Sequence, residues 1–329
     1  MTLRVLYICG SPNQTTQMHQ ISSFLPEAEA NFTPYYGGPI LDFAKKARLC
    51  EFSIAGTKLT RRCLDYLEAH SLKLDIGGRR GPYDLVLTCS DVVVPDNILG
   101  VPIVLVQEGI LDPNNVLGEL VRKFPVLPRW IAGTSTTGMS RAYSRFCVAS
   151  AGYKRYFARR GAPEERLVVT GIPNFDNCAR YLTNDFPHRG YALVCTSDAR
   201  ETLKLDKRRE FVEWAVEKAG GRPLIFKLHP NENLRRATRE LKRWVPDALV
   251  FESGDTNAMI ANAEVLITQY STVVFVGLAL GKECYSYHPM EELVELVPEQ
   301  NGEAAKRIAD VCRDLMAARG ADLRDGVAA

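Results

Sequence analysis

Short apolar runs alternate with amphipathic stretches along most of the chain. The first apolar run, residues 3–9, ends at a Gly-Ser-Pro-Asn turn and is followed by a helical pattern over residues 15–24. Apolar runs of this length bounded by turn residues indicate strands, and a period near 3.6 indicates helices. In the first half of the chain the same reasoning predicts a helix over residues 152–160 and strands over residues 85–89, 102–106, 146–149 and 167–170.

The alternation restarts after a polar connection that contains Asn184, Pro187 and Gly190. Strands are predicted over residues 191–195, 223–228, 248–251, 265–268 and 284–287, and helices over residues 206–219, 232–244, 257–262, 272–280 and 303–319. Alternating strands and helices are typical of parallel sheets. The pattern predicts an α/β chain with two Rossmann-like parallel-sheet domains, residues 1–182 and 190–302, and a C-terminal helix and tail over residues 303–329. Because parallel sheets bind ligands beyond the carboxyl ends of their strands, we expect a ligand cleft between the domains.

Composition narrows the function classes. The 329 residues carry a net charge of +2, so no overall basic field favours nucleic acid as a partner. Nine cysteines without Cys-x-x-Cys pairs favour a reducing compartment, and we predict a cytoplasmic protein. No apolar stretch is long enough to span a bilayer, although peripheral association with the inner face of a membrane and a homodimer stay open.

Three loops that follow predicted strands of the second domain contain groups that bind phosphate. His229 comes directly after a buried strand and precedes Pro230, so it is expected either to donate a hydrogen bond to a nucleotide phosphate or to cap a turn. Ser271 and Thr272 stand where a strand enters a helix, as an anion site or as an ordinary N-cap. Arg200, in the first loop of this domain, is either a further phosphate ligand or a surface arginine.

A nearby cluster of basic residues has a different interpretation. It combines cationic and acidic side chains at the predicted start of a helix: Lys204, Asp206, Lys207, Arg208, Arg209 and Glu210. Mixed charges of this kind indicate first a solvated helix start and second a phosphate-binding patch.

Candidate residues of the first domain also follow strands. Ser11 and Asn13 lie in the loop after the first strand, and we expect them to face the cleft and bind the nucleotide, although the glycine pattern of a dinucleotide site is missing there. Glu108 and Asp91 follow two further strands, and a carboxylate there is expected to act as a general base, or else as a helix cap or structural ion pair. The loop over residues 171–176 is expected to shape the hinge side of the cleft.

These residues resemble a known superfamily. His229-Pro230, Ser271-Thr272 and Gln107-Glu108-Gly109 resemble the GT-B superfamily around CDP-glycerol glycerophosphotransferases and bacterial sialyl- and polysialyltransferases. The resemblance implies that His229 and the Ser-Thr pair bind the nucleotide phosphates and that Glu108 works near the acceptor. It also implies a metal-independent glycosyltransferase or polyol-phosphate transferase of surface polysaccharide or glycoconjugate biosynthesis. Its donor is a nucleotide-activated sugar or polyol, its acceptor is a glycan or a lipid-linked molecule, and it needs no cofactor. In this sequence Gln107 replaces the first acid of the family motif.

The chain is also similar to UDP-N-acetylglucosamine 2-epimerases, through Asp91, Glu108-Gly109, residues 169–171 and residues 229–231. Two departures favour the transferase: Asp198-Ala199-Arg200-Glu201 lacks the epimerase histidine, and residues 271–276 lack the ribose-binding glutamate. A third alternative is a subunit that binds a nucleotide sugar without catalysis, which Gln107 keeps open.

Overall fold

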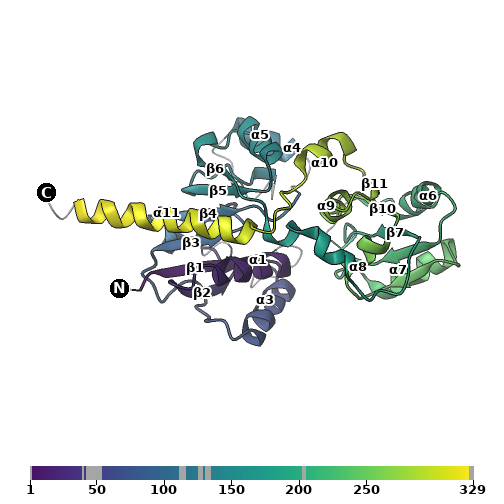
Figure 1. Cartoon of the computed structure of the whole chain (residues 1–329), viewed down its shortest axis with the longest axis horizontal. Helices are drawn as coiled ribbons and strands as arrows, with labels where there is room; N and C mark the ends of the chain where they lie inside the picture. Colours follow the sequence, from purple (N-terminus) through teal and green to yellow (C-terminus); the bar gives the residue numbers. More distant parts are fainter. Residues whose placement is uncertain are drawn as a thin grey trace. The chain divides into compact units, whose positions relative to one another are not determined.

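The computed structural model describes residues 2–38, 41, 54–110, 116–124, 129, 135–201 and 205–325. The chain forms two compact units (Figure 1). Unit 1 comprises residues 1–176 and 301–329, and unit 2 comprises residues 177–300.

Unit 1 is built on a six-stranded parallel sheet in the order β2-β1-β3-β4-β5-β6. Its strands are β1 (Arg4–Cys9), β2 (Glu29–Pro34), β3 (Leu85–Thr88), β4 (Ile103–Val106), β5 (Arg145–Val148) and β6 (Leu167–Val169). Its helices are α1 (Pro12–Ser23), α3 (Thr57–Ala69), α4 (Val116–Lys123), α5 (Ala151–Arg159) and α11 (Ala304–Asp325). Short 3₁₀ turns are η1 (Asp96–Ile98), η3 (Glu164–Arg166) and η4 (Pro173–Phe175). The order reverses between β1 and β3, which makes the ends of these two strands a topological switch point.

The C-terminal helix α11 belongs to unit 1 and is not a separate part of the molecule. Ile308, Ala309 and Cys312 of α11 are fully buried in the same apolar cluster as β1, β3 and β4, and α11 lies against α1 (Figure 1). Asp176 fixes the start of this helix, because its carboxylate accepts the backbone N–H groups of Gly302 and Ala304 at 2.7 and 2.8 Å. The division that we predicted, residues 1–182, 190–302 and 303–329, therefore differs from the structural one.

Unit 2 has a five-stranded parallel sheet in the order β11-β10-β7-β8-β9. Its strands are β7 (Ala192–Cys195), β8 (Leu224–Lys227), β9 (Leu249–Phe251), β10 (Val265–Thr268) and β11 (Glu283–Tyr285). Its helices are η5 (Cys178–Leu182), α6 (Arg208–Ala219), α7 (Leu234–Trp244), α8 (Thr256–Asn262), α9 (Val274–Ala279) and α10 (Met290–Leu296). This order is that of a Rossmann sheet, with its switch point between β7 and β10. The two Rossmann-like parallel-sheet units are confirmed, and the cleft stays a prediction.

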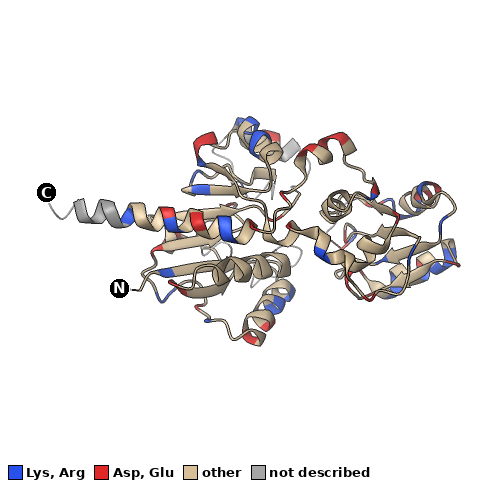
Figure 2. Cartoon of the chain, viewed as in Figure 1, with Lys and Arg blue, Asp and Glu red and all other residues tan. Residues whose placement is uncertain are grey.

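In each unit the central strands are apolar and buried, and most charged residues lie outside them. Central strands such as β3, β4, β7 and β10 are buried along their whole length, as expected for parallel strands covered on both faces. Figure 2 shows that acidic and basic residues occur mainly on helices and loops, with the signs mixed in both units. Among the described residues, no helix is long and apolar enough to cross a membrane.

Candidate functional site

Glu108, beyond the end of β4, is held by two residues that follow β1. Its Oε1 accepts a 2.5 Å hydrogen bond from the Ser11 hydroxyl, and its Oε2 accepts a 2.6 Å bond from the Gln14 side-chain amide. Ser11 also caps α1, since its Oγ accepts the N–H of Gln14 at 3.1 Å. The half-buried carboxylate is therefore fixed at the carboxyl edge of the sheet with both oxygens oriented. Sequence reasoning selected Ser11 and Glu108 separately but missed Gln14.

The glycine at the end of β1 makes this arrangement possible. A Cβ at Gly10 would lie 2.3 Å from Oε1 of Gln14, which is far inside van der Waals contact. The Gln14 side chain therefore crosses directly over Gly10 on its way to Glu108. The close approach of the Gln14 side chain to the backbone explains why a glycine follows β1, although the sequence has no dinucleotide-binding glycine pattern there.

Gln107, the residue that replaces an acid of the family motif, has a structural role. It is buried, its Oε1 accepts the backbone N–H of Ala149 at 2.9 Å, and its Nε2 donates to the Gly109 carbonyl at 3.0 Å. A carboxylate could accept from Ala149 but could not donate to Gly109. The amide thus links the β4 and β5 loops, and Glu108 is the acid that this motif presents.

The loop after β6 holds α1 in place. Asn174, in η4, donates from Nδ2 to the Asn13 carbonyl at 2.7 Å, and its Oδ1 accepts from Thr16 and Gln20 at 3.2 and 3.1 Å. Asn13 itself is exposed. This loop, expected at the hinge, is thereby connected to the helix that carries Ser11 and Gln14.

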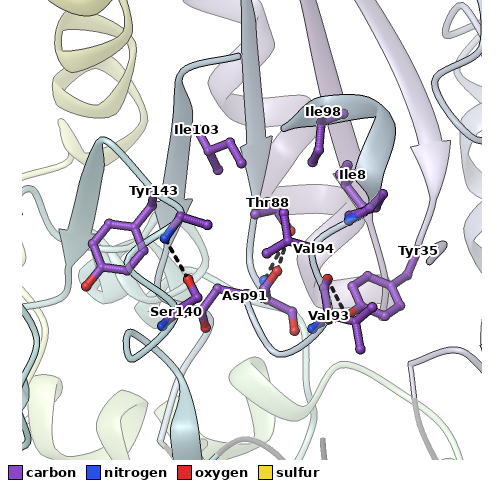
Figure 3. Close-up of a pocket in the computed structure, with 13 residues that line it drawn as sticks. Ile8, Tyr35, Thr88, Asp91, Val93, Val94, Ile98, Ile103, Ser140 and Tyr143 are labelled. Atoms are coloured by element: carbon purple, nitrogen blue, oxygen red, sulfur yellow. Dashed lines mark hydrogen bonds between the residues drawn. The ribbon is translucent and has the colours of Figure 1, made fainter. Parts of the chain in front are cut away.

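Asp91, the second carboxylate candidate, lies beyond β3 and is 2 % exposed. Its Oδ1 and Oδ2 accept the backbone N–H groups of Gly138 and Ser140, both at 3.0 Å, and Arg129 lies 3.6 Å from Oδ2. Asp91 lines a small pocket beside Tyr35 and Ser140 (Figure 3). The pocket encloses about 10 Å³, roughly the space of one water molecule. Through these contacts Asp91 anchors the loop that contains Gly138 and Ser140. A catalytic role for Asp91 stays a prediction.

In unit 2, His229 lies at the end of β8, and its main chain is fixed from two sides. The His229 N–H donates to Oε2 of Glu232 at 2.8 Å and to the Thr196 hydroxyl at 3.1 Å. The ring Nδ1 accepts the Asn231 N–H at 3.3 Å and lies 3.6 Å from Oδ2 of Asp198, beyond hydrogen-bond distance, so we assign the ring proton to Nε2. Burial lowers the pKa of His229, against the opposing effect of the Asp198 and Glu232 carboxylates. The ring is therefore a neutral Nε2–H donor near pH 7.

A buried ion-pair network supports the His229 loop. Oε1 of Glu232 lies 2.9 Å from Nη1 of Arg208, and the Thr196 hydroxyl donates to the other oxygen of Glu232. Arg208 also contacts Asp206 at 2.9 Å and the Ser197 carbonyl at 2.7 Å.

The prediction of a solvated helix start is wrong for Arg208, which is 5 % exposed, whereas Arg209 and Lys207 do pair at the surface. Lys204 lies outside the described residues. Sequence reasoning also missed Glu232, although its position three residues after His229 was a usable signal.

Arg200 is engaged by carboxylates. Its guanidinium makes two hydrogen bonds to Glu240, at 3.1 and 2.8 Å, and Nε lies 3.4 Å from Asp206. Phosphate binding by Arg200 would have to replace part of this bidentate pair. Its phosphate role stays a prediction, at a site where the side chain is already partnered.

Ser271 and Thr272 follow β10 at the switch point of unit 2. The Ser271 hydroxyl accepts a long 3.4 Å bond from Val273, and both residues are half-buried. The structure thus places His229 and the Ser-Thr pair at the same edge of one sheet. Strand β7 and the loop that follows it lie between them. In unit 1 the structure brings Ser11 to Glu108 but not to Asp91. The described residues contain no cluster of three or more His, Cys, Asp or Glu side chains suited to a metal ion.

No protein-family model matches the chain, and no curated protein matches it by sequence. Solved structures do match over nearly the whole length. The wall teichoic acid polymerase TagF superposes with a TM-score of 0.54 at 12 % identity, covering 97 % of this chain and 90 % of that one. The UDP-GlcNAc 2-epimerase from Neisseria meningitidis bound to UDP-GlcNAc gives 0.57 at 12 % identity, with coverages of 95 % and 100 %. A putative UDP-N-acetylglucosamine 2-epimerase from Listeria monocytogenes gives 0.55 at 14 % identity, with coverages of 94 % and 95 %. With its two all-parallel sheets, the chain has the two-domain α/β fold of the GT-B type.

Proposed function

We propose that the protein is a GT-B-type transferase that moves a sugar or polyol phosphate from a nucleotide-activated donor to an acceptor hydroxyl. The observation that carries the proposal is the orientation of Glu108 by Ser11 and Gln14. A carboxylate held at a strand end, half-open to solvent, is equipped to take a proton from a hydroxyl group.

The nucleotide is assigned to unit 2. His229 and the Ser271-Thr272 pair lie at the carboxyl edge of a sheet with the strand order of nucleotide-binding Rossmann domains. The Nε2–H of His229 and the two hydroxyls are suitable donors to phosphate oxygens. The neighbouring folds support this assignment, since one of the epimerase structures contains UDP-GlcNAc.

The proposed reaction is a single displacement. Glu108 accepts the proton of the acceptor hydroxyl, and the hydroxyl oxygen forms the new bond to the transferred group as the bond to the nucleotide phosphate breaks. The leaving nucleotide keeps the electron pair of that bond, and hydrogen bonds from His229 and the Ser-Thr hydroxyls stabilise the added charge. No metal or cofactor is assigned a role. The proposal places the enzyme in the cytoplasm, with a glycan or a lipid-linked acceptor.

The test is a product assay with a panel of donors, namely CDP-glycerol, CMP-sialic acid, UDP-N-acetylglucosamine and a GDP-sugar, each with saccharide and lipid-linked acceptors. Chromatography would separate free nucleotide, transferred product and epimerised donor. The proposal expects free nucleotide and transferred product in equal amounts from one donor. Conversion of UDP-N-acetylglucosamine to its 2-epimer would instead show the epimerase, and tight donor binding without any product would show a binding subunit.

A further inference from the structure

Two exposed aromatic side chains of unit 2 lie together at the carboxyl edge of its sheet. Tyr270 follows β10 and is 55 % exposed, and Tyr287 follows the neighbouring strand β11 and is 39 % exposed. Their ring centroids lie 5.5 Å apart at an interplanar angle of 75°. Other aromatic side chains described in unit 2 are buried or half-buried. Open tyrosine faces at a ligand-binding edge indicate a surface that is covered when a ligand binds.

The main chain around these rings is fixed by Gln269. The Gln269 carbonyl accepts the N–H of Tyr287 at 3.0 Å and the hydroxyl of Ser286 at 2.7 Å, so the ends of β10 and β11 are joined. Its side-chain amide accepts from Ser197 at 2.7 Å and donates to Asp206 at 3.0 Å, which joins the β7 loop to the same assembly. His288 packs edge-on against Tyr270 at 5.1 Å. The main chain that carries both rings is therefore fixed, and the Tyr270 ring contacts Tyr287 and His288.

The strand order sets the distance from these rings to the phosphate-binding candidates. β7 lies between β8, which ends at His229, and β10, which ends at Tyr270. Parallel strands are about 4.8 Å apart, so the two strand ends are separated by roughly 10 Å. A nucleoside diphosphate is long enough to extend from one to the other across the switch point between β7 and β10. With its phosphates between His229 and the Ser271-Thr272 pair, its base would lie beyond the end of β10, toward β11 and the two tyrosines.

We propose that Tyr270, buttressed by Tyr287, is the stacking surface for the base of the bound nucleotide. The inference rests on the proposed function, because it assigns a place to the base of the same donor. A tyrosine face is matched by the flat aromatic face of a nucleobase, and stacking of this kind tolerates different bases. Discrimination between cytosine, uracil and guanine then falls to groups at the ring edge, and Tyr270 supplies affinity common to all three.

The test compares Tyr270→Ala with Tyr270→Phe in calorimetric titrations of the full chain with CDP, UDP, GDP and inorganic pyrophosphate. Pyrophosphate has the phosphates without the base and thus reports on the phosphate site alone. We expect Tyr270→Ala to weaken the nucleotide that wild type binds by about 5- to 150-fold, the range measured for loss of one aromatic stacking partner. Tyr270→Phe, which keeps the ring, is expected to restore affinity to within about threefold. Pyrophosphate affinity should be the same in all three proteins.

Each contrary outcome has a separate meaning. If wild type binds a nucleotide and Tyr270→Ala binds it equally well, the stacking surface is refuted and the proposed function stands. An equal loss for pyrophosphate also refutes it, since the ring would then act on the phosphates or on the fold. If wild type binds none of the nucleotides and no donor reacts, the proposed function fails together with the inference. Thermal melts of both variants would verify that the loop remains folded.

Discussion

The Ser11 hydroxyl donates a 2.5 Å hydrogen bond to Glu108, which lies 97 positions further along the chain. Gln14 donates to the other carboxylate oxygen at 2.6 Å. The N-cap residue and the first turn of α1 thereby fix the direction of the Glu108 carboxylate, which follows β4. If Glu108 is the base, these donors are positioning residues, and their loss should affect turnover more than donor binding.

Gln14→Met tests this positioning, because methionine has a similar length and cannot donate. A hydrogen bond to a charged group contributes about 1.5–3 kcal/mol, so we expect kcat to fall by roughly 10- to 150-fold with little change in the KM for the donor. Gln20→Met, on the same helix but bonded to Asn174, is the matched control and should change kcat less than about twofold. Equal losses in both variants would mean that α1 matters only for the fold.

Glu108→Gln separates catalysis from binding. Removal of a general base slows turnover by about 10²- to 10⁴-fold, while nucleotide affinity should be retained. Steady-state product formation and calorimetry on the same preparation measure the two quantities. Full activity in this variant would exclude Glu108 as the base and direct attention to Asp91.

Gln107→Glu should weaken the fold without improving catalysis. The new carboxylate would face the Gly109 carbonyl that Nε2 of Gln107 now contacts at 3.0 Å in a buried site. An unsatisfied buried carbonyl costs about 1–3 kcal/mol, and we expect a loss of stability of this size in urea unfolding. Glu68→Gln, at an exposed position of α3, is the control and should unfold nearly as wild type does. A stable and more active Gln107→Glu protein would contradict the structural role.

Arg208 and Arg209 form a natural pair for testing the buried network. Arg208 has 4 % of its side chain exposed beside Asp206 and Glu232, whereas Arg209 has 73 % exposed beside Glu213. Both stand at the start of α6, so alanine changes helix propensity equally. Breaking a buried pair costs about 3–5 kcal/mol, and breaking a surface pair costs about 0–1 kcal/mol. Equal destabilisation in denaturant titrations would show that solvent reaches Arg208.

The lowered pKa of His229 predicts proton uptake when a nucleotide binds. Burial keeps the free ring neutral, and a phosphate beside it favours the protonated form. Donor affinity should therefore rise as the pH falls through the pKa of the complex, and level off below the pKa of the free protein.

A nucleotide-sugar diphosphate diester is the suitable ligand, because it does not itself titrate in this range. His229→Gln should remove the pH dependence, and His188→Gln should keep it. Because the unfolded chain binds the proton more readily, the contribution of His229 to folding stability decreases as the pH falls below about 6.5. Affinity that rises with pH would contradict this assignment.

The main features of the fold were predictable because they depend on local pattern. Long buried strands such as β4 and β10 appear in the sequence as unbroken apolar runs. Strand β2, by contrast, was not predicted, since its buried positions include Asn31 and Thr33. Polar residues buried by pairing with β1 give no apolar signal.

The positions of the candidate residues in the fold were predictable, and their contacts were less so. The strand-end rule placed Ser11, Glu108 and His229 beyond the ends of strands, because it depends on the order of elements along the chain. It could not find that Gln14 reaches Glu108, or that Arg208 supports the His229 loop through Glu232. These contacts join residues that only the folded chain brings together, and the spacing of charges in sequence favoured a solvated surface for Arg208.

The most direct measurement of the central claim is a calorimetric titration of wild type and His229→Ala with CMP, CDP, UDP and GDP. Loss of a donor to a phosphate is expected to weaken binding by about 10- to 150-fold, for the one or two nucleotides that wild type prefers. Thermal shifts at saturating nucleotide should show the same order. The account predicts selective nucleotide binding that depends on His229. Binding of no nucleotide by wild type, or equal binding by His229→Ala, would contradict it.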